Sequence, residues 1–333
     1  MKIYLFFVFA AFILLSCNKE PDTVSKSNDI YIKSNDVRVK ICKWKNNHIS
    51  AASFTWDDNN WTIKDCSEIF ERYDYTCTFF VNPSGYMSAG LLSDLIKVNA
   101  RNFEIGDHSA SHARLDTMGI DGLNKEIVGA KNKLLDLFGY CYSFAYPFHL
   151  RSELSDEIVK DTHIFCRNFF VNNNDVVAWG NNSDNTLQSR INAIDESQVI
   201  NGWALFGGHG LDEAGYNPIP DYELDSLLSY VSHKDIWVDT FTEIAKYYTI
   251  YKLVDLKYGD KKIVLDGIDD CIALFYHHNL KSCIISLSFT SSKEITLDGQ
   301  NIIDTEIKEN KDGYYTYIVN VDIMNSNEIK IKE

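Results

Sequence analysis

The sequence predicts an α/β protein, namely a distorted barrel of the (β/α)7 type followed by a small, all-β, sandwich-like domain. Two observations carry this prediction. Short apolar segments alternate with segments of helical periodicity through residues 44–250, about seven times in all. From residue 251 to residue 333 the helical periodicity is replaced by short strand-like segments separated by turn residues.

Length and composition fit this plan and exclude one class of partner. The chain has 333 residues, of which 45% are hydrophobic and 13% aromatic, so a sizeable core can form. The formal net charge is −15, and no cluster of Lys and Arg interrupts it. Because binding to phosphates depends on such clusters, nucleic acid is not an expected partner.

The N-terminus predicts export. One Lys precedes an apolar run that is too short to span a membrane comfortably, and Ser16 and Cys17 follow the run directly. This arrangement resembles a bacterial lipoprotein signal, which implies that residues 1–16 are removed and that a lipid on Cys17 anchors the protein at the periplasmic face or the cell surface. An ordinary secretory signal is the alternative. Residues 17–43 are polar and are expected to form a tether.

The barrel elements are expected in a regular order. The predicted strands are HISAASFTW, YTCTFFVN, FEIGDHS, CYSFAYPF, HIFCRNFFV, WALFGGHG and DIWVDTF, with helices such as IKDCSEIFERY, AGLLSDLIKVNA and TEIAKYYTIYK between them. Residues 172–200 lack clear periodicity and are expected to form a long loop. In the second domain, KIVLDGI, CIALFYHHN, SCIISLSF and GYYTYIVNV are among the predicted strands.

Polar side chains follow several of the predicted barrel strands. Asp57 and Asp58 end the first strand, His108 and His112 follow the third, and His209 ends a later one. Because barrels of this kind carry function at the carboxyl ends of their strands, these side chains are expected to converge. Two imidazoles and one carboxylate are a normal ligand set for a catalytic zinc ion, and the second carboxylate is then free to act as a base. The sequence therefore predicts a metal-dependent hydrolase.

The same residues resemble the motifs of the polysaccharide deacetylases, that is, carbohydrate esterase family 4 with its nodulation-type deacetylase homology domain. The family's T-F-D-D-G motif is similar to residues 55–59, where Asn59 replaces Gly. Its H-[ST]-x-x-H motif is present unchanged at residues 108–112, and its Leu-x-His motif resembles residues 206–209. The resemblance covers residues 44–250.

The resemblance implies a role for each matched residue. Asp57 would be the general base that activates the attacking water, and His209 would be the general acid. A divalent ion, zinc above others, would be held by Asp58, His108 and His112. The backbone N–H of Phe148 would stabilise the oxyanion. Apart from the resemblance, Tyr146 and Trp203 are aromatic candidates for contact with the sugar, with packing in the core or at its rim as the alternative.

The sequence departs from the family at the third motif. The family has Arg there to orient the base, whereas this chain has Ala145 in the stretch FAYPFH. Some relatives of this form supply an arginine from the next strand, and Arg167 stands in the corresponding place. We therefore expect Arg167 to assist Asp57. No match to the family's fourth motif, which tunes the general acid, is found.

The expected function is removal of acetyl groups from a carbohydrate, either an N-acetylhexosamine polymer or another acetylated glycan. The alternative is a glycan-binding surface lipoprotein that keeps the deacetylase scaffold without its activity. The missing Arg at position 145 favours this alternative, and the intact set of Asp and His residues opposes it.

Overall fold

The computed structural model describes residues 28–34, 36–85, 87–180, 184–259, 262–278, 280, 282–309 and 312–332. The predicted signal peptide, Cys17 and the first part of the predicted tether lie outside these ranges. Among the residues that the structure describes, no helix is both long and apolar enough to cross a membrane.

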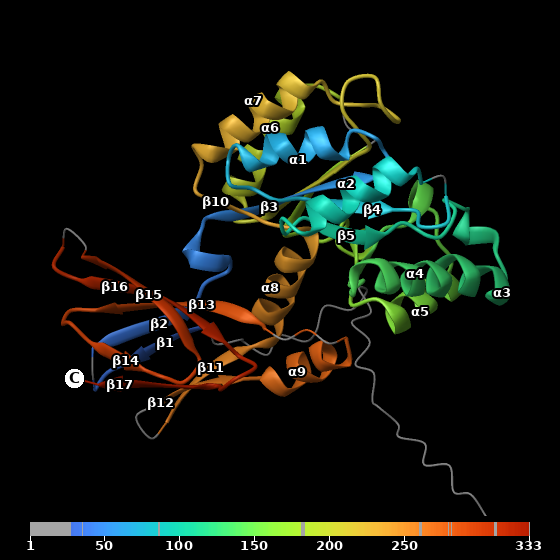
Figure 1. Ribbon diagram of the computed structural model, residues 1–333. Coiled ribbons are helices and arrows are strands. Elements are labelled where there is room, and N and C mark those ends of the chain that lie inside the picture. Colours follow the sequence, from blue (N-terminus) through green and yellow to red (C-terminus); the bar gives the residue numbers. More distant parts are fainter. Residues whose placement is uncertain are drawn as a thin grey trace, which may run out of the picture.

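A sheet of parallel strands forms the centre of the first domain (Figure 1). Its order is β7-β6-β5-β4-β3-β9-β8, and β10 pairs with the first half of β3. Since β7 and β8 are its two edges, the sheet is an open form of the predicted distorted barrel. The strands are β3 (Ser50–Asp57), β4 (Thr78–Val81), β5 (Glu104–Asp107), β6 (Ser143–Phe144), β7 (Phe165–Cys166), β8 (Val176–Trp179), β9 (Trp203–Gly208) and β10 (Ile236–Val238).

Helices cover both faces of this sheet. One face packs against a group of four helices through a core that includes Phe54, Phe206 and Leu228, and the other face packs against α8 (Figure 1). The covering helices are α1 (Ile63–Glu71), α2 (Ala89–Asn99), α6 (Leu187–Val199), α7 (Asp221–Ser232) and α8 (Phe241–Leu253). The short α3 (Ile120–Leu123) continues through a π-helical turn (Asn124–Val128) into α4 (Gly129–Phe138), and α5 (Glu153–Thr162) lies beside them.

Residues 172–200, which we expected to form a loop, instead contain β8 and α6. The helix is capped by the Thr186 side chain, which accepts a hydrogen bond from the Ser189 backbone N–H. Its buried face includes Arg190, so the hydrophobic periodicity that would reveal the helix is interrupted by a charged residue.

The second domain consists of two antiparallel sheets with apolar side chains of one contiguous core. One sheet has the order β1-β2-β13-β16-β15 and the other β11-β12-β17-β14. The strands of the first are β1 (Asp29–Ile32), β2 (Val37–Ile41), β13 (Ile284–Ser291), β15 (Ile302–Glu309) and β16 (Tyr315–Asp322). Those of the second are β11 (Asp255–Gly259), β12 (Lys262–Asp266), β14 (Thr296–Asp298) and β17 (Glu328–Lys332).

Two expectations about this part of the chain were wrong. Residues 28–43 were expected in a tether, but β2 pairs with β13 and completes the first sheet. The cause is the alternation of VRVKI, in which Val37, Val39 and Ile41 are buried, which is the pattern of a half-buried strand. The predicted strand at CIALFYHHN was also wrong, because this segment lies largely in α9 (Ile268–His277), which packs against α8.

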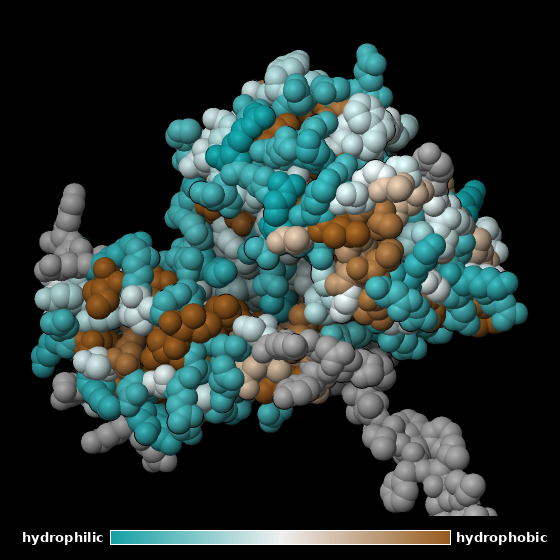
Figure 2. Space-filling model, viewed as in Figure 1, coloured by the Kyte–Doolittle hydropathy of each residue, from teal (hydrophilic) through white to brown (hydrophobic). Residues whose placement is uncertain are grey.

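Apolar side chains are exposed on both domains in this view. Figure 2 shows them over the sandwich domain and in a second patch on the right of the first domain, with hydrophilic side chains around both. The outer side of β15 contributes Ile303 and Ile307, which are 51% and 58% exposed. In β15, therefore, the positions of the isoleucines do not indicate which face of the strand is buried.

Candidate metal-dependent active site

The carboxyl ends of β3 and β5 bring three predicted ligands together. Asp58 directly follows β3, while His108 and His112 follow β5. One ligand atom from each lies within 4.8 Å of the others. Asp58 and His112 both adopt a positive φ, of 72° and 61°, so the backbone turns sharply as it presents them. The prediction that these three residues meet is confirmed by their positions.

The loops that carry the ligands are fastened to one another. The Asn59 side chain and the Asn82 backbone exchange two hydrogen bonds of 2.8 and 2.9 Å. The Asn82 side-chain amide in turn donates to the backbone carbonyls of His108 and Ser109. Asn59, which replaces the family's glycine, thus links the loop after β3 to the loop after β5 through the end of β4.

The ligand geometry suits a divalent ion such as zinc. His108 is buried, its Nδ1 lies 2.8 Å from the carbonyl oxygen of Ala145, and the proton on Nδ1 leaves Nε2 free to bind a metal. Nε2 of His108 and Nε2 of His112 lie 3.7 and 3.2 Å from Oδ1 of Asp58. Burial lowers the pKa of His108, which favours the neutral imidazole that a metal requires.

Arg167 holds Asp57 from the interior of the sheet. Two hydrogen bonds of 2.6 Å join the guanidinium to the two carboxylate oxygens, and a third, of 2.7 Å, reaches the Thr55 hydroxyl. Both side chains are buried, and the guanidinium also stacks over the ring of Phe80. Burial alone would raise the pKa of Asp57, but Arg167 and the nearby His108 outweigh it and keep that pKa below its ordinary value. The expected contact between Arg167 and Asp57 is present.

His209 follows β9 at the same edge of the sheet. Its charge influences Asp57, and its ring meets the ring of Tyr216 edge-to-face with the centroids 5.5 Å apart. Nδ1 of His209 is buried and has no hydrogen-bond partner among the residues that the structure describes. The group that would tune a general acid in the family therefore has no visible counterpart in this part of the chain.

The segment after β6 borders the ligands. Phe148 has a positive φ of 57°, and its ring, 56% exposed, lies 4.5 Å from the ring of His112. The Asn168 side chain binds this segment twice, since its Oδ1 accepts from the Tyr146 backbone N–H and its Nδ2 donates to Nδ1 of His149. Arg167 and Asn168 are neighbours, so one short turn orients both the base and the segment of Phe148.

Two expected substrate contacts were wrong. Tyr146 is 1% exposed, and its ring packs against Phe144. Trp203 is fully buried at the start of β9, the end opposite to His209, where its indole N–H donates to the Ser53 hydroxyl. Because both rings are buried, neither can contact a carbohydrate in solution. The prediction failed because the sequence does not distinguish an aromatic residue at a strand end from one that packs in the core.

Sequence reasoning also missed residues at the site. Tyr216 is 65% exposed beside His209, and His149 feels the charges of Arg167 and Asp57. Burial and the nearby Arg167 lower the pKa of His149. His149 directly follows Phe148, so its place at a strand end was a usable signal, whereas Tyr216 stands in an irregular loop that offered none.

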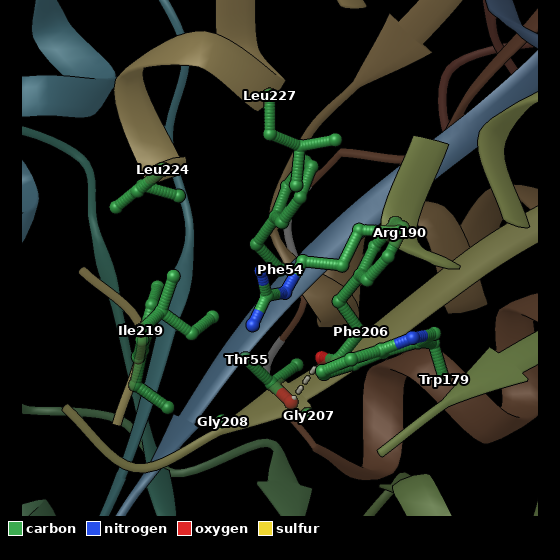
Figure 3. A pocket seen from close by; sticks show the side chains of 11 residues that line it. Phe54, Thr55, Trp179, Arg190, Phe206, Gly207, Gly208, Ile219, Leu224 and Leu227 are labelled. Atoms are coloured by element: carbon green, nitrogen blue, oxygen red, sulfur yellow. Dashed lines mark hydrogen bonds between the residues drawn. The ribbon is translucent and has the colours of Figure 1, made fainter. Parts of the chain in front are cut away.

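The small cavity in Figure 3 is separate from this site. It measures about 10 Å³ and lies between β3, β9 and the helices α6 and α7, with Thr55 bonded to the carbonyl of Phe206 at its floor. Leu224 and Leu227 line it, and Arg190 extends across it. A space of this size holds about one water molecule, so it is no binding site for a sugar.

Comparison with known proteins identifies a family that part of this chain resembles. Residues 45–164 match the family model of the polysaccharide deacetylases. No protein of curated function matches the chain. A solved structure from Mycobacterium smegmatis, assigned to the polysaccharide deacetylases, has a TM-score of 0.52 at 13% identity and covers 65% of this chain and 96% of its own. This likeness supports the fold.

Two further solved structures are similar at lower scores. The Xyl-CE4 domain of a multidomain xylanase, from the hindgut metagenome of Trinervitermes trinervoides, has a TM-score of 0.46 at 16% identity and covers 59% of this chain and 89% of its own. A pseudoenzyme of carbohydrate esterase family 4 from Bacillus anthracis has a TM-score of 0.41 at 15% identity, covering 59% and 65%.

Residues 45–164 of the first domain are therefore similar to the polysaccharide deacetylases, a family of hydrolases. The matched residues include Asp57, Asp58 and both ligand histidines, but they end before Arg167 and His209. The parts assigned to these last two residues therefore depend on the geometry of this chain.

Proposed function

We propose that the protein removes acetyl groups from a carbohydrate, using a divalent metal ion, Asp57 as general base and His209 as general acid. One observation carries the proposal. The two-point contact of Arg167 with Asp57 lies directly beside the cluster of Asp58, His108 and His112. A buried carboxylate that is oriented and kept ionised beside a metal-binding cluster is the arrangement that water activation requires.

The side chains divide the work. Asp58, His108 and His112 hold the ion, for which zinc is the best match because two imidazoles and one carboxylate leave a position open. Zinc in such a site lowers the pKa of a water molecule and polarises a carbonyl oxygen. Asp57 takes the proton of the attacking water, and Arg167 fixes the direction of its oxygens.

The remaining groups act on the leaving group and on the acetyl oxygen. His209 protonates the leaving nitrogen or oxygen, and the backbone N–H of Phe148 stabilises the charge on the acetyl oxygen. The amide of an N-acetylhexosamine and the ester of an O-acetylated glycan pass through the same kind of tetrahedral intermediate. Both substrate classes are therefore within the proposal.

Acetate release from a panel of glycans tests the proposal. Chitin oligomers, peptidoglycan and acetylated xylan are incubated with the zinc-loaded protein and with Asp57→Asn, which keeps the shape of the base but cannot accept a proton. We expect release from at least one glycan by the native protein only. If neither protein releases acetate from any glycan while the native protein holds its metal, the proposal is wrong.

A glycan-binding protein without activity is the second candidate. The observation that favours it is the absence of a partner for Nδ1 of His209 among the described residues. The contact between Arg167 and Asp57 opposes it, because an arginine binds both oxygens of the proposed base although residue 145 is Ala. Retained affinity for a glycan with no acetate release above the Asp57→Asn level would decide for this candidate.

We also propose that the protein is exported and anchored in the membrane by a lipid on Cys17, because an apolar run ends just before Ser16 and Cys17. Labelling of producing cells with a fatty acid tests this. We expect label on the native protein and none on Cys17→Ser. Equal labelling of both proteins, or labelling of neither, would contradict the anchor.

A further inference from the structure

A second group of side chains that could hold a metal ion is buried at the end of β5, next in sequence to the ligand loop of the first. Asp107 ends β5, Cys141 precedes β6, and His163 follows α5. One ligand atom from each lies within 4.8 Å of the others. All three residues are at most 2% exposed. Asp107 immediately precedes the ligand His108, but its side chain belongs to this inner group.

Hydrogen bonding leaves two lone pairs facing this group. The Thr162 hydroxyl gives its proton to the Ile158 carbonyl at 2.6 Å, so at 2.9 Å from Nδ1 of His163 it accepts, and Nδ1 carries the ring proton. Nε2 of His163 is then a bare acceptor. Oδ1 of Asp107 accepts from the Ser109 backbone N–H, while Oδ2 of Asp107 has no partner among the described residues, and neither has Nε2 of His163.

The spacing of these two atoms is that of two ligands of one ion. Nε2 of His163 and Oδ2 of Asp107 are 3.2 Å apart without forming a hydrogen bond. Two ligands bound at about 2.0–2.1 Å to a tetrahedral ion lie about 3.3 Å apart, with their lone pairs directed at the ion and not at each other. Asp58 and His112 in the outer site show the same separation of 3.2 Å.

We propose that Asp107, Cys141 and His163 bind a second divalent transition-metal ion, zinc by the chemistry of its donors. A thiolate and a carboxylate together balance the charge of a divalent ion, and a neutral imidazole adds none. The three residues are closed off from solvent, so an ion here would serve the structure and not catalysis, and a donor outside this group would fill the fourth position of a tetrahedral ion. The inference does not depend on the proposed function of the outer site.

The ion would join three segments that are distant in sequence. It would connect the end of β5 with the start of β6 and the end of α5, directly below the loop that carries His108 and His112. The Lys131 ammonium already donates to the Thr162 carbonyl beside this group. The ion would hold the ligand loop from beneath and so fix the geometry of the outer site.

A single shared proton is the competing explanation. A protonated Asp107 could donate to Nε2 of His163, and burial, which raises the pKa of Asp107 and lowers that of His163, favours this neutral pair. The geometry opposes this explanation. Oδ2 of Asp107 lies 3.2 Å from Nε2 of His163, but the two atoms are not aligned for a hydrogen bond, as a shared proton would require. The shared-proton explanation also leaves Cys141 without a role.

Cobalt spectroscopy separates the two explanations, because the outer site contains no cysteine. The purified protein is loaded with Co²⁺, and the near-ultraviolet charge-transfer absorption of a thiolate bound to cobalt is recorded with the metal content. We expect two equivalents of metal and a thiolate band. One equivalent without a thiolate band would overturn the proposal in favour of the shared proton.

Variants assign the band to its site. His112→Ala, which leaves the inner group untouched, should lose one equivalent and keep the band. Cys141→Ser should lose the band, whereas Cys42→Ser, a buried cysteine of the other domain, should keep it. If Cys141→Ser fails to fold, the His112→Ala protein alone decides, because loss of the band in that variant would contradict a second site.

Discussion

Arg167 and Asp57 are 110 residues apart in sequence and meet through two hydrogen bonds of 2.6 Å. The pair is buried at the edge of the sheet where the metal-binding cluster lies. The Arg167 guanidinium reaches Asp57 from the turn after β7, whereas residue 145, before Pro147, is Ala.

Replacing Arg167 by alanine should lower kcat about 10- to 100-fold at unchanged metal content, because the base would lose its orientation. Arg167→Lys should recover only part of the loss, since an ammonium cannot bind both carboxylate oxygens. Acetate release and metal analysis measure both effects. Arg114→Ala, which removes an exposed arginine paired with Asp116, is the control and should be active. Unchanged kcat in Arg167→Ala would refute this role.

Removing His209 should affect substrates according to their leaving group. His209→Ala should lower kcat about 10²- to 10⁴-fold for an N-acetyl substrate, whose amine must be protonated as it leaves. The phenolate of an aryl acetate leaves as a stable anion without a proton, so hydrolysis of an aryl acetate should fall much less. The exposed His233 provides the control variant His233→Ala. Equal losses on both substrates would show that His209 is not the general acid.

Removing the metal should abolish activity reversibly. A chelator should reduce acetate release to the level of Asp57→Asn, and added Zn²⁺ should restore it, because the ion polarises the acetyl carbonyl. His112→Ala, with its ligand to the ion deleted, should not recover at the same Zn²⁺ concentration. His48→Ala, outside the cluster, should behave as the native protein does. Full activity in the chelated protein would rule out a metal-dependent reaction.

Tyr216 should contribute to substrate binding more than to chemistry. Its exposed ring stands beside His209 and can stack on a sugar, a contact of about 0.5–1.5 kcal/mol, or about 2- to 12-fold in KM. We expect Tyr216→Ala to raise KM by that factor and to leave kcat nearly unchanged. Tyr314→Ala removes another exposed ring, which belongs to the sandwich domain, and should alter neither constant. A fall in kcat alone would argue against stacking.

Asp175 should make stability depend on pH. Its carboxylate bonds to Lys43, Lys252 and Tyr248 at 2.7–2.8 Å. Burial would raise the pKa of Asp175, but these partners outweigh it and hold the pKa below its ordinary value of 3.8. A depressed pKa stabilises the fold above about pH 4, and this stabilisation is lost as the pH falls below that value.

Asp175→Asn should therefore lower the free energy of unfolding by about 1–3 kcal/mol at pH 7, the usual range for hydrogen bonds to a charged group. The difference from the native protein should shrink as the pH approaches 3. Urea denaturation at several pH values measures it, and the exposed Asp136→Asn is the control. A difference that stays constant with pH would contradict the charge-based explanation.

The sequence by itself determined the features that depend on residues close to one another in the chain. Strand and helix alternation predicted the parallel sheet and its covering helices, and the spacing of His108 and His112 predicted two ligands from one loop. Asp58 could be placed with them because the carboxyl ends of parallel strands lie at one edge. The sheet forms as predicted and the three side chains lie together because local periodicity and strand direction constrain where the side chains point.

Only the tertiary structure decided what depends on packing between distant segments. Burial removed Tyr146 and Trp203 from the substrate surface, since a core aromatic and a surface aromatic look alike in sequence. Pairing with β13 drew residues 37–41 out of the expected tether, because a strand needs a partner that may lie hundreds of residues away. The contact of Arg167 with Asp57 became visible in the same way, through the sheet that places both side chains at one edge.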